Sequence, residues 1–313
     1  MLHHPAAYFS NLLIITLICV GVSRGTEPSE RNIKVLVISG QNNHNWKKTN
    51  PYLHWILDHQ EHIEAVVYNT PETDDPALWQ NWKPKFSDHD VVLLNYNGQD
   101  WPESIRDNFE VFIRTGGAAL IIHASNNLFT GWDEYEKMVG LLWRDRDYGT
   151  SLFLDASGNV VRELAGEGRA MGHGGVFDWV VSVREMDHPI TKGMPKHWMH
   201  CQDELYHGQR GPAQNINMLM TAYSDPKQGG SGQHEPVLWW VPYGEGKVVT
   251  NLMGHVWSDG QMDCLECVGF QTILTRSCEW LGTGNCRNPI PDNFPIVNRI
   301  SKITGTNESN AAE

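Results

Sequence analysis

The stretch Lys34–Ser39 reads KVLVIS, and its pattern decides the fold. Three more short apolar runs follow it, each bounded by polar residues: Ile63–Tyr68, Val91–Tyr96 and Ala118–His123. Strands covered on both faces have this composition, because neither face meets water. Between the last two runs, Pro102–Thr115 places its apolar residues on one helical face and ends at a Gly-Gly pair. The alternation predicts an α/β fold with a parallel sheet flanked by helices.

The second half of the chain continues with helices and strands in a less regular order. A five-residue turn, PYGEG, separates the last two expected strands and predicts a hairpin. We expect one domain over residues 33–282 and a polar C-terminal tail over residues 283–313. The remaining expected elements are helices at Trp132–Leu142 and Val268–Leu281 and strands at Phe177–Arg184, Asn217–Tyr223, Val237–Val241 and Lys247–Met253.

The first residues have the pattern of a secretory signal. Leu12–Val22 is an apolar run too short to span a bilayer, which takes about 20 residues. Small and polar residues follow it, so we expect a signal peptide over residues 1–25 and export to the periplasm or the exterior. Membrane contact is then expected only through this segment. No Lys or Arg precedes the run, and an uncleaved anchor or a lipid at Cys19 stays open as an alternative.

Charge and cysteine content narrow the class of protein further. The chain has 24 Lys and Arg against 37 Asp and Glu, a formal net charge of −13. Nucleic acid is not expected as a partner, because a polyanion would be repelled. An odd number of cysteines follows the signal, so an exported chain would keep at least one free thiol. We expect one or two disulfides among Cys201, Cys264, Cys267, Cys278 and Cys286.

Polar and aromatic side chains gather where the predicted strands end. Ligands of open α/β sheets bind at the carboxyl ends of the strands. Imidazole, amide and aromatic groups together suit a polyhydroxylated ligand, because rings cover its C–H faces and polar groups bond its hydroxyls. The candidate substrate-binding residues, at these ends and in the segment DELYHG, are His44, Trp46, Asn95, Tyr96, Asn126, Asp203, His207 and Trp257.

Several segments together resemble the trehalose-utilisation (ThuA-like) family. They include GQNNHNW (40–46), IIHASNN (121–127), DHPITKGMP (187–195), DELYHG (203–208) and GHVW (254–257), and the resemblance extends over residues 33–281. It implies a flavodoxin-like parallel sheet flanked by helices, similar to that of class I glutamine amidotransferases. It also implies a link to sugar metabolism, notably of trehalose and of oxidised (keto) disaccharides.

The sequence departs from an amidotransferase at the position of the nucleophile. Such an enzyme needs a cysteine on a sharp turn between a strand and a helix. The matching turn after Ala118–Ile122 holds His123, Ala124 and Ser125. Thiol catalysis is therefore not expected, and Ser125 lacks the G-x-S-x-G context of a serine hydrolase.

Acid–base or metal chemistry by histidine and carboxylate remains. Imidazole titrates near neutrality and can move protons at sugar carbons or hydroxyls. The candidate catalytic residues are His123 and His255, expected to face each other, and Glu204, expected to orient or charge one of them. Should the unknown cofactor be a divalent metal, its candidate ligands are His123, His173, Glu204 and His255.

The leading hypothesis is an exported enzyme that acts on a sugar or glycoside, keto-sugars included, by this chemistry. A non-catalytic carbohydrate-binding protein that keeps the same crevice is the alternative, and a structural or partner-binding module is a third reading. A small-molecule carbohydrate is the expected partner in the first two. The sequence leaves the sugar, the bond and the oligomeric state open.

Overall fold

The computed structural model describes Met1 and residues 32–305, so most of the predicted signal peptide and the end of the predicted tail lie outside the described residues. In the described part the helices are α1 Trp46–Asp58, α2 Pro76–Asn81, α3 Glu103–Arg114, α4 Asp133–Val139, α5 Asp263–Glu266 and α6 Val268–Thr283. The strands are β1 Ile33–Ser39, β2 Ile63–Asn69, β3 Val91–Leu94, β4 Ala118–Ile122, β5 Thr150–Leu154, β6 Val160–Glu163, β7 Gly172–Val183, β8 His197–His207, β9 Arg210–Gly211, β10 Asn217–Tyr223, β11 His234–Tyr243 and β12 Gly246–Asn251.

The strands of residues 32–305 form a 12-stranded mixed sheet. Nine of them follow the order β2-β1-β3-β4-β12-β11-β10-β7-β8, and β5, which pairs with β11, β6 and β9, connects the other three to this path. Neighbours from β2 to β12 pair in parallel, and neighbours from β12 to β8 pair antiparallel. The predicted parallel sheet therefore accounts for one half of the sheet only. We call the two parts the parallel half (β2, β1, β3, β4, β12) and the antiparallel half (β11, β10, β7, β8).

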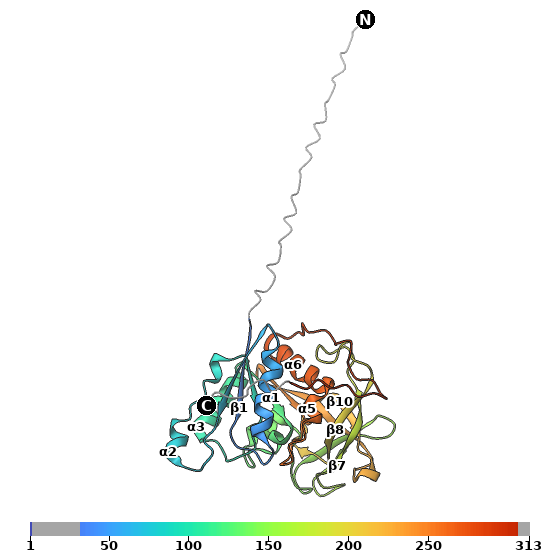
Figure 1. Cartoon of the computed structure of the whole chain (residues 1–313), viewed down its shortest axis with the longest axis horizontal. Coiled ribbons are helices and arrows are strands. Elements are labelled where there is room, and N and C mark those ends of the chain that lie inside the picture. The colour runs from blue at the N-terminus through green and yellow to red at the C-terminus, as the bar shows by residue number, and fades with distance from the viewer. Residues whose placement is uncertain (2–31, 306–313) are drawn as a thin grey trace. The chain divides into compact units, whose positions relative to one another are not determined.

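Helices cover both faces of the parallel half, which explains its apolar strands. Val35 and Val37 of β1 belong to a core cluster shared with α1 and α6. Leu36 and Ile38, on the opposite face, belong to a second cluster shared with α2, α3 and α4. Figure 1 shows α1 and α6 next to each other beside β1, with α3 on the other side of that strand. This arrangement is the α/β architecture that the alternating sequence predicts.

A tight turn joins β11 to β12 and confirms the predicted hairpin. The register ends on the pair Tyr243 and Gly246, so Gly244 and Glu245 form a two-residue loop. Gly244 has a φ of +58°, and a Cβ there would lie 2.5 Å from the Arg114 carbonyl oxygen. A glycine at the first central position suits the turn types that match the twist of paired strands. The chain thereby leaves the antiparallel half and enters the last parallel strand.

Strand β8, HWMHCQDELYH, is an element that the apolar pattern did not predict. It pairs antiparallel with β7 along most of its length. Both of its faces carry polar groups, so its sequence lacks the apolar run of a doubly covered strand. Successive side chains of a strand point to opposite faces. Asp203 and Glu204 therefore point in opposite directions, although they are neighbours in sequence.

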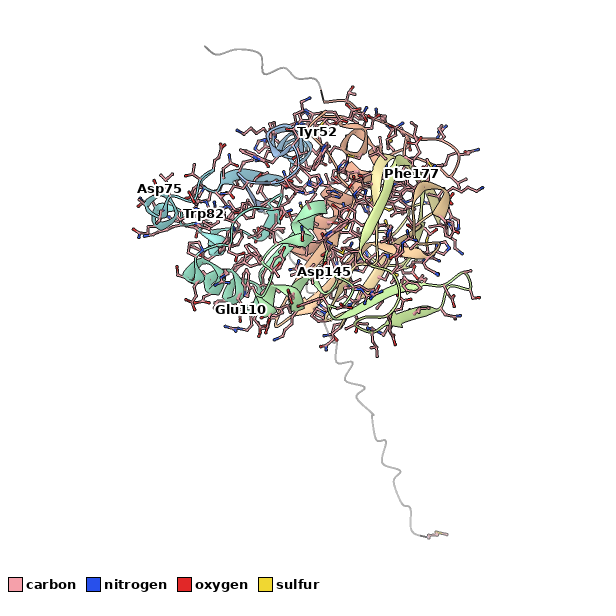
Figure 2. The ribbon with its side chains drawn as sticks, turned by 90° about the horizontal axis from the view of Figure 1, so that it is seen from below. Tyr52, Asp75, Trp82, Glu110, Asp145 and Phe177 are labelled. Carbon is pink, nitrogen blue, oxygen red and sulfur yellow. The ribbon has the colours of Figure 1, made fainter. Side chains whose placement is uncertain are left out.

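The segment after α6 packs onto the body and differs from the expected loose tail. Tyr52 of α1, labelled in Figure 2, donates a hydrogen bond of 2.6 Å to the Ile303 carbonyl oxygen. The Val268 amide donates to the Ser301 carbonyl, and Phe294 is buried. All five cysteines of residues 32–305 are free thiols, so the expected disulfides are not formed. Among the described residues, no helix combines the length and the apolar character needed to cross a membrane.

Candidate functional site

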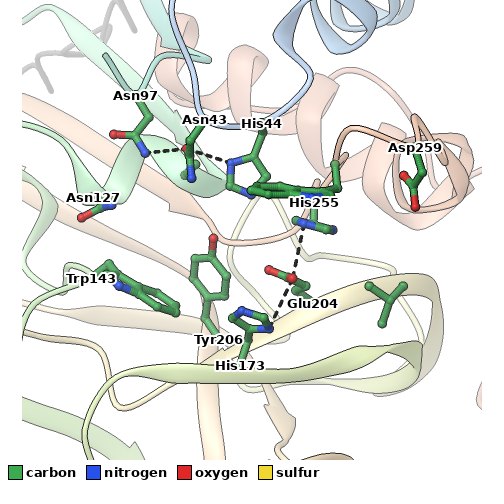
Figure 3. Close-up of a pocket in the computed structure, with 13 residues that line it drawn as sticks. Asn43, His44, Asn97, Asn127, Trp143, His173, Glu204, Tyr206, His255 and Asp259 are labelled. Atoms are coloured by element: carbon green, nitrogen blue, oxygen red, sulfur yellow. Dashed lines mark hydrogen bonds and ion pairs between the residues drawn. The ribbon is translucent and has the colours of Figure 1, made fainter. Parts of the chain in front are cut away.

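A cavity of about 500 Å³ lies where loops at the carboxyl ends of the parallel strands face β7 and β8. Figure 3 shows its side chains converging from both halves of the sheet. Its lining residues are Asn43, His44, Asn97, Ala124, Asn127, Trp143, His173, Val176, Glu204, Tyr206, His255, Trp257 and Asp259. This is the edge at which ligands of open α/β sheets bind.

His44 comes from the loop that follows β1. Gly40, with a φ of +113°, turns the chain at the end of that strand. Nδ1 of His44 lies 3.0 Å from the Asn43 side-chain oxygen, which also accepts a 2.7 Å hydrogen bond from the Asn97 amide (Figure 3). Since an amide oxygen only accepts, Nδ1 carries the proton and Nε2 keeps its lone pair. Burial and the nearby His255 and His173 lower the pKa of His44 to about 3, so its ring is neutral.

His123 stands at the sharp turn after β4, with a φ of +43°. Positive φ is uncommon outside glycine and marks a backbone that the surroundings hold in place. Nδ1 of His123 donates to the Leu252 carbonyl at 2.7 Å, and Nε2 accepts from the Tyr206 hydroxyl at 2.9 Å. Burial, with the neighbouring imidazoles of His44 and His255, holds the pKa of His123 well below its usual range. The Tyr206 hydroxyl occupies the lone pair of Nε2, and His123 itself is buried behind the cavity lining.

His255 is placed by a buried carboxylate. Gly254, with a φ of +117°, bends the chain just beyond β12. Asp203 accepts hydrogen bonds from the backbone N–H groups of Gly254 at 2.8 Å and of His255 at 3.0 Å. It also lies 2.8 Å from Nε2 of the buried His200. Burial opposes a charged His200, but Cys267 and Asp203 together raise its pKa to about 9, so this is a buried ion pair.

Glu204 faces His255 across the cavity, on the opposite side of β8 from Asp203. Its Oε1 lies 3.3 Å from both Nε2 of His255 and Nδ1 of His173, as Figure 3 shows. Burial, then the charge of Asp203, raises the pKa of Glu204 to about 7. Burial lowers the pKa of His255. Near neutral pH, Glu204 and His255 therefore compete for one proton, which either group can hold.

Aromatic rings and amides line the rest of the cavity. Trp257 stacks on His255 at 6.1 Å between ring centroids, and Trp143 packs edge-on against Tyr206 at 4.6 Å. Asn43, Asn97 and Asn127 add amide groups on the side of the parallel half. Tyr206 stays protonated, because burial raises its pKa well above the usual value.

Three of the donor groups come close enough for a metal. One ligand atom from each of His44, His123 and Glu204 lies within 4.8 Å of the other two. The sequence had pointed to His123, His173, Glu204 and His255. In the structure His123 and His255 do face each other, with ring centroids 5.4 Å apart. The side chain of His173 is 41% exposed and lies 3.3 Å from Glu204, at the edge of the cavity.

Six predicted substrate-binding residues do not line the cavity. Trp46 lines a separate hollow beside Lys47 on α1. The other five are buried and bonded inside the protein: Asn95 to Thr49, Tyr96 to the Gln99 carbonyl, Asn126 to Gln209, Asp203 to His200, and His207 near Ser224. Their side chains turn inward at or near the strand ends. Of the eight predicted binding residues, His44 and Trp257 line the cavity.

Sequence reasoning missed Tyr206, Trp143 and the amides of Asn43, Asn97 and Asn127. Tyr206 had a usable signal: it stands two residues after Glu204, the spacing that puts side chains on one face of a strand. Asn43, Asn97 and Asn127 each stand within two positions of a residue that was chosen. Nothing local marks Trp143, which enters from the connection between α4 and β5.

Fold and site together define an α/β protein with a histidine-lined cavity at the carboxyl ends of its parallel strands. A family model described as "Trehalose utilisation" matches residues 34–281, and the chain belongs to this ThuA family. A protein of Parabacteroides merdae ATCC 43184 described as ThuA-like is similar at a TM-score of 0.82 and 34% identity, over 87% of this chain and 98% of that one. One of Bacteroides uniformis ATCC 8492 has a TM-score of 0.54 and 16% identity, over 84% and 98%, and supports the fold alone. A search of curated proteins found no match.

Proposed function

We propose that the protein is an enzyme that acts on a sugar or glycoside, keto-sugars included, by acid–base chemistry of histidine and carboxylate. The observation that carries the proposal is the contact between His255 and Glu204, 3.3 Å apart, inside the cavity. Groups that exchange protons with a substrate need pKa values near the working pH, and buried sites are where such values arise. The raised pKa of Glu204, about 7, meets that requirement.

Each catalytic candidate receives a distinct role in this proposal. His255 removes or returns a proton at a carbon or hydroxyl of the sugar, because its ring is neutral and lines the cavity. Glu204 holds that ring and takes up or releases the shared proton. His123, bonded to Leu252 and Tyr206, orients the tyrosine hydroxyl, whose oxygen stays free to accept a hydrogen bond from a sugar hydroxyl. All three residues belong to rigid elements or to the turns directly after them.

The lining of the cavity supports a carbohydrate as the ligand. Trp143 and Trp257 offer flat apolar faces, and Asn43, Asn97 and Asn127 offer donors and acceptors for hydroxyl groups. A volume of about 500 Å³ falls within the range of about 300–1,000 Å³ usual for small-molecule sites. The family description, trehalose utilisation, points to the same class of ligand.

We also propose that the parallel half derives from a flavodoxin-like core similar to that of class I glutamine amidotransferases. Its order β2-β1-β3-β4-β12 follows the 2-1-3-4-5 order of that fold. The turn that would carry the nucleophilic cysteine of an amidotransferase carries His123, with a φ of +43°. This substitution supports acid–base chemistry in place of thiol chemistry at the same point of the fold.

Export remains part of the proposal and rests on the sequence of residues 1–25. Expressed in a bacterial host from its full gene, the protein should appear outside the cytoplasm with its first residues removed. Intact Met1 on protein from the cytoplasmic fraction, found by mass spectrometry, would overturn it.

Turnover by the purified protein tests the main proposal. The assay offers disaccharides, glycosides and their 3-keto derivatives, with and without divalent metal, and follows products by nuclear magnetic resonance. We expect product from at least one of these sugars and loss of that product in the His255→Ala variant. Saturable sugar binding without any product would instead favour the non-catalytic carbohydrate-binding protein.

A further inference from the structure

We propose that His44, His123 and Glu204 bind one divalent transition-metal ion of the zinc type in the cavity. One ligand atom from each residue lies within 4.8 Å of the other two. Two imidazoles and one carboxylate form a ligand set that zinc takes in catalytic sites, where a fourth position stays open. The inference rests on these donors and is independent of which sugar is bound.

The two imidazoles already have the tautomer that a metal requires. Nδ1 of His123 donates to the Leu252 carbonyl, and Nδ1 of His44 donates to the side-chain oxygen of Asn43. Metal-binding histidines are usually held in this way, with the second ring nitrogen bonded to a carbonyl so that the first presents its lone pair. In both rings this leaves Nε2 as the donor. The Tyr206 hydroxyl bonds Nε2 of His123 at 2.9 Å and would yield that lone pair to the ion.

The charges around the donors also favour a cation. Among residues 32–305, the cavity lining includes the carboxyl groups of Glu204 and Asp259 and no Lys or Arg. Glu204 is the one carboxylate among the three proposed ligands, so it brings negative charge to the site. A divalent ion would supply the missing positive charge.

The donors must draw together by a modest distance. Tetrahedral ligands at about 2.1 Å from zinc stand about 3.4 Å from one another, somewhat closer than the 4.8 Å limit found here. His123 is fixed on both ring nitrogens, so His44 and Glu204 are the side chains that move. Glu204 Oε1 lies 3.3 Å from His255, which can keep the carboxylate oriented while it binds the ion.

A bound ion would take over one task in the proposed function. It would polarise a substrate oxygen, and the Tyr206 hydroxyl, released from Nε2 of His123, would become a donor for that oxygen. His255 would remain the group that moves the proton.

Metal binding is measured directly, without sugar. The purified protein is dialysed against a chelator, freed of chelator, and titrated with zinc chloride in a calorimeter. We expect one Zn²⁺ per chain with a dissociation constant below about 1 μM. His44→Ala and Glu204→Gln should each weaken binding by about 100-fold or more, since loss of an outer partner alone costs about 10–100-fold.

Two matched variants control for general effects. His59→Ala removes an exposed histidine at the end of α1, and Trp143→Phe changes the cavity without removing a proposed ligand. Both should keep zinc affinity within about threefold of wild type. Circular dichroism checks that every variant is folded. Cobalt(II) in place of zinc should give a visible spectrum without the near-ultraviolet charge-transfer band of a cobalt–thiolate bond.

Three results would overturn the inference. They are an absence of zinc binding by the wild type, unchanged affinity in both ligand variants, and a cobalt–thiolate band that would move the site to the buried cysteines. None of these results bears on whether the protein turns over a sugar, and failure to turn over a sugar does not bear on the titration.

Discussion

The parallel half and the antiparallel half supply opposite walls of the same cavity, and they hold their side chains differently. On the parallel half, three histidines follow strand ends: His44, His123 and His255. The backbone turns at a residue with positive φ in each case: at His123 itself, at Gly254 just before His255, and at Gly40 at the start of the loop that carries His44. On the antiparallel half, Glu204 and Tyr206 project from the interior of strand β8. Turns therefore direct the side chains of the parallel half into the site, and the alternation of side chains along β8 directs those of the antiparallel half.

This difference assigns opposite roles to two adjacent acids. Asp203 points into the protein, where it bonds His200 and the backbone of Gly254 and His255. Glu204 points into the cavity, where it meets His255. The antiparallel half therefore contacts His255 twice: Asp203 holds its backbone N–H, and Glu204 contacts its ring. Substitutions that separate these two tasks test the comparison.

The largest expected effect is on turnover. His255→Ala and His123→Ala should each lower the turnover number by about 10²–10⁴-fold, the usual contribution of a general acid–base group or of its immediate partner. His255 lies at the cavity surface, so its loss should leave the melting temperature close to that of wild type. His59→Ala is the matched histidine control. Full activity in both the His255→Ala and the His123→Ala variant would show that the histidines of the parallel half take no part in the reaction.

The next effect is on stability and concerns the inward-facing acid. Asp203→Ala should lower the free energy of unfolding by about 3–5 kcal/mol, because it removes the carboxylate partner of the buried charged His200 and the acceptor of two backbone N–H groups. Glu204→Ala should lower the free energy of unfolding far less, since the partners of Glu204 line an open cavity. Urea denaturation of the two variants measures the difference. Equal stability losses would contradict the division of roles between the two faces of β8.

The smallest effect is a pH dependence of stability from Glu235 on β11. Burial raises the pKa of its carboxyl to about 7, although Ser231 and the Gly208 amide lower it, while Glu163 raises it and Arg169 lowers it. A raised pKa means that the stability is present below the unfolded-state value of about 4.3 and is lost as pH rises toward 7.

Glu235→Gln keeps the shape of the neutral acid and removes this titration. At pH 8 the variant should be more stable than wild type by about 1–3 kcal/mol, and at pH 4 the two should be nearly equal. Thermal or urea unfolding across this range measures the effect. If the difference in unfolding free energy between the variant and wild type is the same at every pH, Glu235 does not titrate differently in the folded and unfolded protein.

The strands of the parallel half could be predicted because short windows of the sequence contain their apolar pattern. Runs such as Val91–Leu94 and Ala118–Ile122 are apolar throughout, since helices cover both of their faces. β8 was not predictable in this way. Its polar groups meet the cavity on one face and a buried ion pair on the other, and both are tertiary contacts that no short window of sequence contains.

The site shows the same limit on a finer scale. His44, Glu204, His255 and Trp257 line the cavity, whereas Asn95 and Tyr96, at the end of β3, turn into the core. The direction of a side chain beyond a strand end depends on one or two backbone angles. Strand-end position therefore narrows the candidates, and only the fold decides which of them reach the ligand.

A double-mutant cycle on His255 and Glu204 tests the central claim most directly, that the two walls act as one proton-transferring unit. The value of kcat/KM is measured for wild type, His255→Ala, Glu204→Gln and the double variant on the substrate found in the turnover assay. We expect kcat/KM to fall strongly in both single variants. The kcat/KM of the double variant should lie within about threefold of that of the less active single variant, because the effects of residues that act as a unit are non-additive. Losses that multiply in the double variant would show that the two residues act independently and would contradict the account.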